Sequence, residues 1–424
     1  MRRGAHGVRR TVARRRRLLA FLAILGPGMI TANAGNDAGG IATFASVGAE
    51  FGYSLLWILI PIAISLGIVQ EMCARMGAVT GKGLSDLIRE RFGVRWTALV
   101  MLSLLIANAG VTVSEFVGIA AAAELFGVSR FIAVPLAAIL VWWLVAKGSY
   151  KKVEKAFLLM SFVFLGYIVS AFLSRPDWTA VGVGLVKPTV RLEHAFVFTL
   201  VAVIGTTISP YMQVYVQSSV VEKGVTADNY SETKTDVWVG TIFAILIVFF
   251  IVVSTAATLH QSGTQIATAA DAARALRPLA GRYAEVLFGV GLFGASMLAA
   301  GVLPLATAYS ISEALGFEKG VSHSFREAPI FLGTFTFLVA VGAAIAVIPN
   351  LPLFRVLLVT QVINGLLLPF VLFAILKLVN NRELMGTRVN GPIYNLAAWV
   401  TAIIVTAISV LYIAMTIFPG VVRL

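Results

Sequence analysis

Long apolar segments alternate with short polar or charged links along almost the whole chain. Each segment is long enough to cross about 30 Å of hydrocarbon, and the links between them are too short to fold as soluble domains. The sequence therefore predicts an all-α polytopic membrane protein with a single transmembrane domain. Its eleven expected spans are residues 18–48, 53–77, 96–125, 130–147, 155–173, 194–221, 236–259, 281–313, 329–348, 353–379 and 394–418.

Polar residues, glycine and proline interrupt two of these spans. In the first, TANAGNDAGGIAT at residues 31–43 contains Asp37, and in the sixth, GTTISPYMQVYVQSS at residues 205–219 contains Pro210. Proline removes a helical donor and clashes with the preceding turn. Irregular backbone at membrane depth is tolerated where it is buried in protein or lines a wet cavity. The alternatives are that Asp37 lies in a loop outside the membrane and that Pro210 only kinks a continuous helix.

The two interrupted spans each begin a set of five. Matched interruptions of this kind indicate a transporter built from inverted repeats, with its site at the midplane between the broken helices. The expected organisation is a tail at 1–17, a first five-helix repeat at 18–173, a second at 194–379 and an additional helix at 394–418. An ionisable residue at the midplane is a functional-site candidate, which singles out Asp37.

Composition and charge support a membrane protein and predict its orientation. Only 12% of the residues are charged, whereas soluble domains carry about 25%. Eight arginines lie in the first 17 residues, directly before a span. If the N-terminus is cytoplasmic, most of the 33 lysines and arginines fall on the cytoplasmic side, as the positive-inside rule predicts. Because the expected spans number eleven, the C-terminus is then expected on the outer side of the cell inner membrane.

The arginine-rich tail is expected to contact anionic lipids of the cytoplasmic leaflet. This distribution argues against a nucleic-acid partner, and no obligate protein partner is evident. Cys73 is the single cysteine, which excludes an internal disulfide and a multi-thiolate metal site. Zinc-protease, serine-hydrolase and P-loop motifs are absent from the sequence, so an enzyme is not expected.

Six segments and the interruption in span six carry a family resemblance. The segments are GPGMITANAGNDAGG, FGYSLLWILI, QEMCARMGAVTGKGLSDLIRERFG, NAGVTVSEFVGIAAAAELFG, RPLAGRYAEVLFGVGLFGAS and TQVINGLLLPFVLFAILKLVNNRELMG. Together they resemble the natural resistance-associated macrophage protein (Nramp) family of divalent-metal transporters, over most of the chain. The resemblance implies a LeuT-like fold with a metal site where spans one and six unwind.

Several ligand positions of that family differ in this chain. The family motif Asp-Pro-Gly-Asn reads Asp37–Gly40 (DAGG) here, so the acid is kept and the amide ligand is lost. The motif Met-Pro-His reads Ser209–Tyr211 (SPY), so a hydroxyl replaces the thioether. The span-three acids align with Thr112 and Glu115, and a histidine linked in the family to proton movement aligns with Gln217.

The resemblance also implies main-chain and amide ligands. Asp37 is expected to bind the cation directly, Gly40 to leave space, and Ser209 to contact the water shell of the ion. Gln361 joins the site in one state, or alternatively only bonds backbone. The backbone carbonyls of Ala34 and Thr206 are expected to contribute main-chain oxygens. The complete expected metal site is Asp37, Ala34, Gly40, Thr206, Ser209 and Gln361.

Other polar or soft side chains are expected around the site or along the pathway. Asn108, Thr112 and Glu115 share one face of span three, and such a stripe should face the bundle interior or a cavity. Glu115 then lies near the site or in an outer vestibule. Met212 could return a thioether ligand, although methionine in an apolar span usually packs. Packing is an equal alternative for Tyr211. The complete set is Tyr211, Met212, Glu115, Asn108, Thr112 and Gln217.

The altered ligands favour a hard, hydrated ion. Thioethers favour transition metals, whereas oxygen and water suit Mg²⁺, Ca²⁺ and Mn²⁺, and Mg²⁺ keeps several waters when protein-bound. All four histidines lie in the tail, links or span ends, so no mid-bundle imidazole is available to relay protons. The chain is most similar to the Nramp-related magnesium transporter branch.

The expected function is import of Mg²⁺, and also Mn²⁺, by alternating access without proton coupling. The ion is the substrate, and no cofactor is expected. Two alternatives remain open at this point. One is a proton-coupled Mn²⁺/Fe²⁺ transporter of the ordinary Nramp type, and the other is an amino-acid transporter of the LeuT fold.

Overall fold

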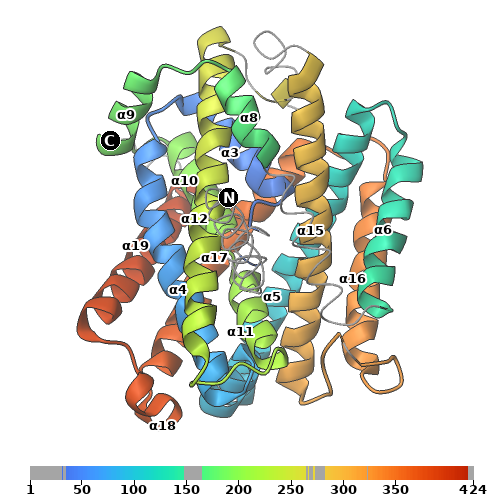
Figure 1. Cartoon of the computed structure of the whole chain (residues 1–424), viewed down its shortest axis with the longest axis vertical. Coiled ribbons are helices and arrows are strands. Elements are labelled where there is room, and N and C mark those ends of the chain that lie inside the picture. The colour runs from blue at the N-terminus through green and yellow to red at the C-terminus, as the bar shows by residue number, and fades with distance from the viewer. Residues whose placement is uncertain are drawn as a thin grey trace, which may run out of the picture.

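The computed structural model describes Thr31 and residues 35–147, 165–263, 266, 271–272, 282–321 and 323–418. These residues form a bundle of helices that run between two ends (Figure 1). The upper end holds residues 52–55 and 174–177, and the lower end holds residues 81–83 and 223–229.

Twelve helices build the bundle, and shorter elements lie in the links. The first half contains α3 (Ala38–Phe51), α4 (Leu59–Thr80), α5 (Leu84–Leu125), α6 (Arg130–Ala146) and α8 (Leu165–Leu173). The second half contains α10 (His194–Thr207), α11 (Pro210–Glu222), α12 (Tyr230–Thr255), α15 (Arg282–Leu315), α16 (Pro329–Ala346) and α17 (Leu353–Val379), and α19 (Pro392–Ile417) follows. The short elements are η1 (Leu56–Ile58), α9 (Trp178–Val186), the π-helical turn η3 (Ala256–His260), α18 (Arg382–Met385) and η4 (Gly386–Arg388).

The predicted spans correspond to these helices. Within the described residues, eight helical segments are long and apolar enough to cross a membrane, and α6 is a shorter apolar helix. Predicted spans one and five are described only in part, by α3 and α8. The all-α polytopic fold class is confirmed.

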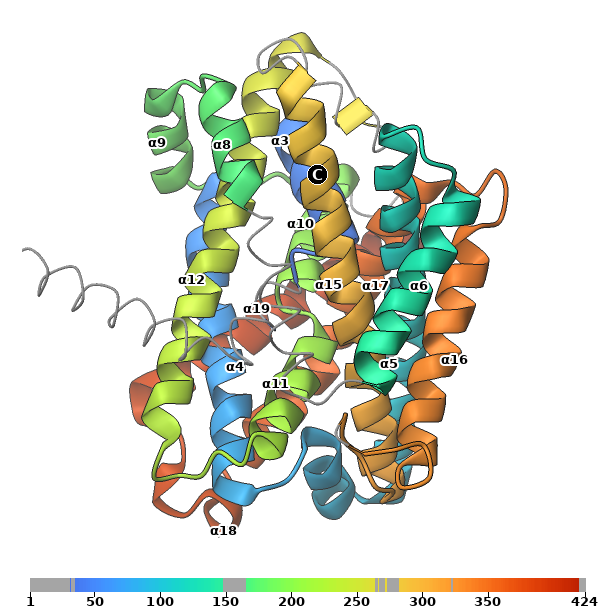
Figure 2. The ribbon, with the colours of Figure 1, turned by 45° about the vertical axis from the view of Figure 1, so that its right-hand side comes forward.

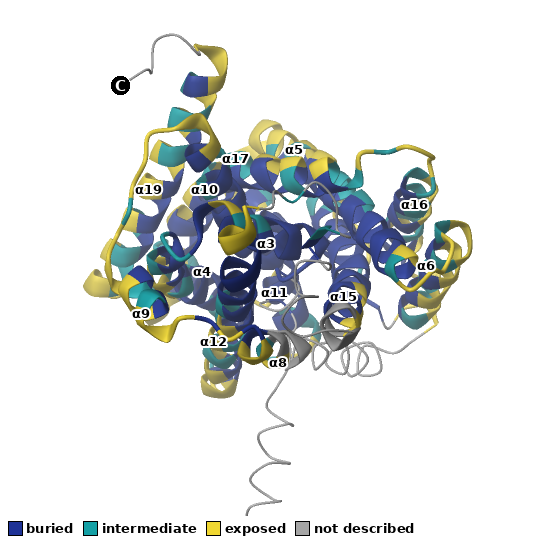
Figure 3. Ribbon diagram, turned by 90° about the horizontal axis from the view of Figure 1, so that it is seen from above, coloured by how far each residue is buried: buried dark blue, intermediate teal, exposed yellow. Residues whose placement is uncertain are grey.

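Apolar side chains cover much of the outside of the bundle. Leu136 on α6, Phe337 on α16 and Ile403 on α19 are each more than 60% exposed. Seen from above, the exposed residues lie on the peripheral helices and the buried residues surround α3, α10 and α11 (Figure 3). An apolar surface of this extent is stable against lipid tails rather than water.

The third span differs from its expected bounds. Helix α5 begins at Leu84, twelve residues before the expected start at 96, and the chain kinks at Gly93, where φ is +76°. The charged residues of the segment before the kink predict a polar link between spans two and three. The segment is helical because Leu84 and Leu87 are buried while Glu90 and Arg91 are exposed, which gives it one apolar face.

The interruption of span six is confirmed as a true break. Helix α10 ends at Thr207, and α11 begins at Pro210, where a missing N–H costs nothing because the first helical N–H groups have no intrahelical partner. In span one, Gly35–Asp37 are also non-helical, and α3 starts at Ala38. Helix α3 packs against α10, α12 and α17 (Figure 2), so both breaks lie inside the bundle.

Candidate functional site

Asp37 is fully buried at the N-terminus of α3. Its carboxylate accepts a hydrogen bond from the backbone N–H of Gly40, in the manner of an N-cap. The turn before it is fixed from the side, because the amide of Asn36 donates to the carbonyl of Ala244 on α12 at 3.1 Å. The favourable interaction of a carboxylate with a helix N-terminus therefore holds this acid inside the bundle.

Three oxygens converge beside Gly40. A Cβ atom at Gly40 would lie 2.7 Å from the carbonyl oxygen of Gly35, 2.8 Å from Oγ1 of Thr206 and 3.1 Å from Oδ1 of Asp37. The Thr206 hydroxyl also donates to the Gly35 carbonyl at 3.3 Å. Gly40 is thus in close contact with a carboxylate, a hydroxyl and a main-chain carbonyl, which are the ligand types that hard cations prefer.

Amide side chains of α17 complete the surroundings of Asp37. Nε2 of Gln361 lies 3.4 Å from each carboxylate oxygen of Asp37. A Cβ at Gly39 would lie 2.1 Å from that nitrogen, so a side chain there would displace the amide of Gln361. Sequence reasoning missed Asn364, whose Nδ2 donates to Oε1 of Gln361 at 3.4 Å and to Oγ of Ser209 at 3.5 Å. Its i+3 spacing from Gln361 was the available signal.

The hydroxyl of Ser209 is hydrogen-bonded to the end of α10. It donates to the Gly205 carbonyl at 2.6 Å and lies 3.2 Å from the Thr206 carbonyl. The Thr206 carbonyl also lies against the turn before Asp37, because a Cβ at Gly35 would be 3.2 Å from its oxygen. Ala34 lies outside the described residues.

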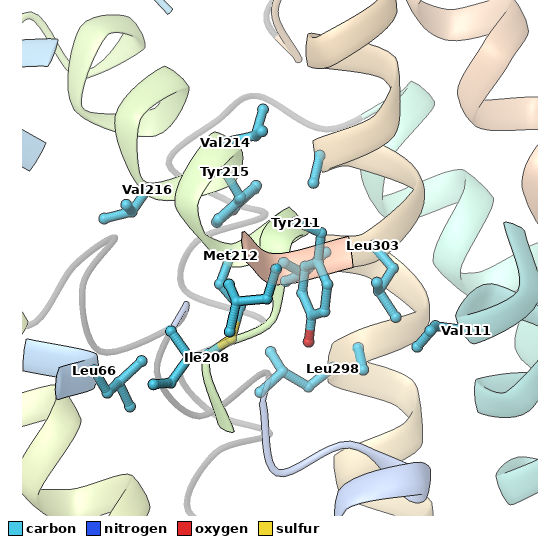
Figure 4. Close-up of a cluster of buried hydrophobic side chains, with 14 of the residues drawn as sticks. Leu66, Val111, Ile208, Tyr211, Met212, Val214, Tyr215, Val216, Leu298 and Leu303 are labelled. Carbon is cyan, nitrogen blue, oxygen red and sulfur yellow. The ribbon is translucent and has the colours of Figure 1, made fainter. Parts of the chain in front are cut away.

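Met212 and Tyr211 are packed in an apolar cluster with Leu66, Ile208 and Leu298 (Figure 4). Met212 nevertheless lies against the turn before Asp37. A Cβ at Gly35 would be 2.7 Å from its Cε and 3.3 Å from its Sδ. The thioether therefore packs beside the site, within a short movement of the converging oxygens.

The polar stripe of α5 lies in the bundle interior, but its members have different partners. Oε2 of Glu115 accepts the N–H of Ala38 at 3.0 Å and so supports the first residue of α3. Asn108 donates to Thr307 on α15 at 2.9 Å, and Thr112 donates to the Asn108 carbonyl at 2.7 Å. Of the three stripe residues, Glu115 is the one that contacts the interruption in span one.

We expect Glu115→Ala to destabilise the folded protein by about 1–3 kcal/mol, because the buried N–H of Ala38 loses its acceptor. Glu115→Gln keeps an oxygen acceptor at the same distance and should restore most of this stability. Thermal unfolding in detergent measures both effects. Ser310→Ala is the control, since its buried hydroxyl donates to the Ala306 carbonyl one turn back on α15. An equal loss for the alanine and glutamine variants would contradict this role.

Gln217 lies at the lower end, away from Asp37. Its Nε2 donates to the Lys82 carbonyl at 2.9 Å. Next to it, Ser218 donates to Glu313 on α15 at 2.6 Å, and the other oxygen of Glu313 accepts the N–H of Ser85 at 3.1 Å. These bonds fasten the end of α11 to the start of α5 and the end of α15.

A cavity of about 680 Å³ opens at the upper end. Its lining comes from α3, α10, α17 and the π-helical turn, and includes Thr43, Ala202, Leu358, Glu50, His260 and Arg355. The first three stand one helical turn from Gly39, Thr206 and Gln361 respectively. The lining of the cavity therefore reaches to within one helical turn of Gly39, Thr206 and Gln361 along their helices.

The site is built on few charges. Among the described residues, no group of three or more histidine, cysteine, aspartate or glutamate side chains is close enough to hold a metal ion. The arrangement can instead hold a cation with one carboxylate, neutral oxygens and water. Asp37, Gly40, Thr206 and Gln361 are brought together, with Ser209 and Met212 adjoining them.

Comparisons with known proteins agree with this fold. The divalent metal cation transporter MntH of Pectobacterium carotovorum subsp. carotovorum is 32% identical over 381 residues, covering 87% of this chain and 89% of the relative. The Eremococcus coleocola manganese transporter is similar in structure with a TM-score of 0.77 at 20% identity, covering 95% of this chain and 89% of that one.

The structure of MhsT in complex with L-phenylalanine is similar with a TM-score of 0.58 at 15% identity, covering 91% of this chain and 97% of that one. These structural likenesses confirm the predicted LeuT-like fold. The family described as natural resistance-associated macrophage protein-like matches residues 28–415. The chain belongs to the Nramp family.

Proposed function

We propose that this protein imports divalent cations, with Mg²⁺ as its main substrate and Mn²⁺ also carried. The observation that carries the proposal is the convergence of Asp37, Gly35 and Thr206 oxygens around one point inside a membrane bundle. The names of the two Nramp-like relatives, a divalent metal cation transporter and a manganese transporter, support the general class.

Preference for Mg²⁺ follows from the ligand types. Glycine at position 40 and serine at position 209 supply neither an amide nor a thioether. A site of one carboxylate and neutral oxygens suits an ion that keeps several waters, as Mg²⁺ does. Gln361 and Ser209 are the side chains that we propose contact the ion or its water shell.

Proton-coupled transport of Mn²⁺ or Fe²⁺, as in the ordinary Nramp type, is the second candidate. It is favoured by the Met212 sulfur, which lies against the turn before Asp37, because a thioether ligand selects softer metals. An amino-acid substrate fits less well, since the carboxylate of Asp37 already occupies the start of α3.

We propose that the lower end faces the cytoplasm and that residues 18–173 and 194–379 act as inverted repeats, followed by the helix at 394–418. The ion enters through the upper cavity, meets Asp37, and is released at the lower end as the broken helices move. An inside-negative potential then favours import by about 4.6 kcal/mol per 100 mV for a divalent ion, twice the value for one charge.

Proton coupling is not part of this proposal. Of the four histidines, His194 and His260 are exposed at the upper end and His323 lies in a lower link, whereas His6 lies outside the described residues. None of the three described imidazoles contacts Asp37. A proton relay through an imidazole would need a histidine near the site.

Flux measurements in proteoliposomes test the proposal. We expect uptake of Mg²⁺ and Mn²⁺ that increases with an imposed inside-negative potential and leaves the internal pH unchanged. Acidification in step with the ion would contradict the uncoupled mechanism. Uptake of Mn²⁺ without Mg²⁺ would favour the ordinary Nramp type, and uptake of neither would overturn the proposed function.

A further inference from the structure

Asn108 and Gln217 each have an unpaired amide oxygen, and three further buried amide side chains of the described residues also have polar atoms without partners. The three further side chains are Gln70 on α4, Gln213 on α11 and Asn364 on α17, and each is fully buried. Among the described residues, both polar atoms of Gln70 lack a hydrogen-bond partner, as do Oε1 of Gln213 and Oδ1 of Asn364. These three side chains thus leave three carbonyl oxygens and one amide nitrogen unpaired inside the bundle.

Such atoms are costly in a membrane protein. Each unpaired buried polar group costs about 1–3 kcal/mol, and an apolar side chain of similar shape avoids that cost. Native structures pair nearly all such groups, so each exception calls for an explanation. Amide oxygens are ligands of hard cations and good acceptors for the water molecules that such cations carry.

Two of the amides are joined to Asp37 by a continuous chain of contacts. Gln361 contacts Asp37, Asn364 contacts Gln361 and Ser209, and Nε2 of Gln213 lies 3.4 Å from the Ser209 carbonyl. Gln213 is one turn into α11, which runs from the break toward the lower end. The chain of contacts therefore leads from the carboxylate toward that end.

Gln70 approaches the same region from α4. Residues Leu66, Gln70 and Gly77 share one stripe of this helix. Leu66 belongs to the cluster around Met212 (Figure 4), and a Cβ at Gly77 would lie 2.9 Å from the Gln217 carbonyl. Helices α4 and α11 both run toward the lower end, so the stripe places Gln70 beside the first turns of α11.

We infer that Gln70, Gln213 and Asn364 form a second binding position for the hydrated divalent cation, between Asp37 and the lower end. This inference rests on the proposed function, because it requires a cation with bound water on the pathway. The amide oxygens accept hydrogen bonds from the water ligands of the ion. The position carries no charge, so it binds the ion more weakly than Asp37 and allows it to leave.

Leucine variants test the inference by removing the polar atoms at similar volume. For Gln70→Leu, Gln213→Leu and Asn364→Leu, we expect the KM for Mg²⁺ uptake into proteoliposomes to rise roughly tenfold, as for loss of one or two hydrogen bonds to a charged group. The KM for Mn²⁺ should rise less, because Mg²⁺ is the ion that gives up water reluctantly. The melting temperature should stay unchanged or rise for Gln70→Leu, because both polar atoms of this side chain lack a partner among the described residues.

The matched control is Asn380→Leu, at the end of α17. Its amide donates to the Leu376 carbonyl and to Asn395, so we expect lower thermal stability and an unchanged ratio of the two KM values. An unchanged Mg²⁺ KM in the three amide variants, or equal changes for both ions, would overturn the inference. If the wild-type protein transports neither ion, the proposed function fails instead. If the wild-type protein transports both ions and Asp37→Asn transports neither, the proposed function holds and the KM values of the amide variants test the second position alone.

Discussion

Replacing Asp37 by asparagine is expected to lower Mg²⁺ and Mn²⁺ uptake at least about 100-fold, while the protein still folds. Asparagine caps a helix N-terminus about as well as aspartate does, so α3 keeps its starting point. The substitution removes only the negative charge from the converging oxygens. Depriving a buried charge of its partner costs about 3–5 kcal/mol, which corresponds to a loss of this size in affinity.

Calorimetry measures the expected loss of ion binding, and uptake into proteoliposomes measures the expected loss of transport. Asp177→Asn is a matched control, because Asp177 caps α9 through Oδ1 and the N–H groups of Thr179 and Ala180 at the upper end. We expect normal transport from the control. Retention of both binding and uptake by Asp37→Asn would show that the cation is held elsewhere.

The helices and breaks of this fold could be predicted because their causes are local. A lipid-crossing helix needs a long apolar stretch, so the span positions followed from the sequence. Other prolines lie inside helices, namely Pro135, Pro304 and Pro369. The second break was therefore predictable only because Pro210 follows a run of glycine and hydroxyl residues. Asp37 was likewise identifiable, as an acid in an otherwise apolar span. The start of α5 was missed because the buried face formed by Leu84 and Leu87 is short and interrupted by charge.

The partners of the site residues could not be predicted in this way. Asn108 bonds Thr307 across 199 positions of the chain, and Gln361 reaches Asp37 across 324. Periodicity shows which face of a helix a residue occupies, but not which helix packs against that face. The same limit hid the role of Asn364, because its i+3 spacing from Gln361 indicates a shared helix face but not the partners of that face. Its role became visible only through its contacts with Gln361 and Ser209.

The close approach of α10 and α17 also could not be predicted from the sequence, because it depends on which helices pack together. This approach determines the position of Gln361. A Cβ at Gly205 on α10 would lie 2.1 Å from the carbonyl oxygen of Gln361 and 2.5 Å from the backbone nitrogen of Gly365 on α17. A Cβ at Gly365 would in turn lie 2.6 Å from the Val201 carbonyl. Small residues allow membrane helices to approach this closely, so the backbone of α10 determines where the amide of Gln361 meets Asp37.

We therefore expect Gly205→Ala to destabilise the protein by about 1–3 kcal/mol, as overpacking of a tight contact does, and to abolish most uptake. Neither backbone atom can move away as a side chain would, so α10 and α17 must separate and Gln361 must shift from Asp37. Gly333→Ala on α16 is the control, because a Cβ there meets nothing within 4 Å and alanine favours a helix. Thermal unfolding and Mg²⁺ uptake report the two effects. A Gly205→Ala protein as stable and active as Gly333→Ala would mean that the spacing of α10 and α17 does not determine the geometry of the site.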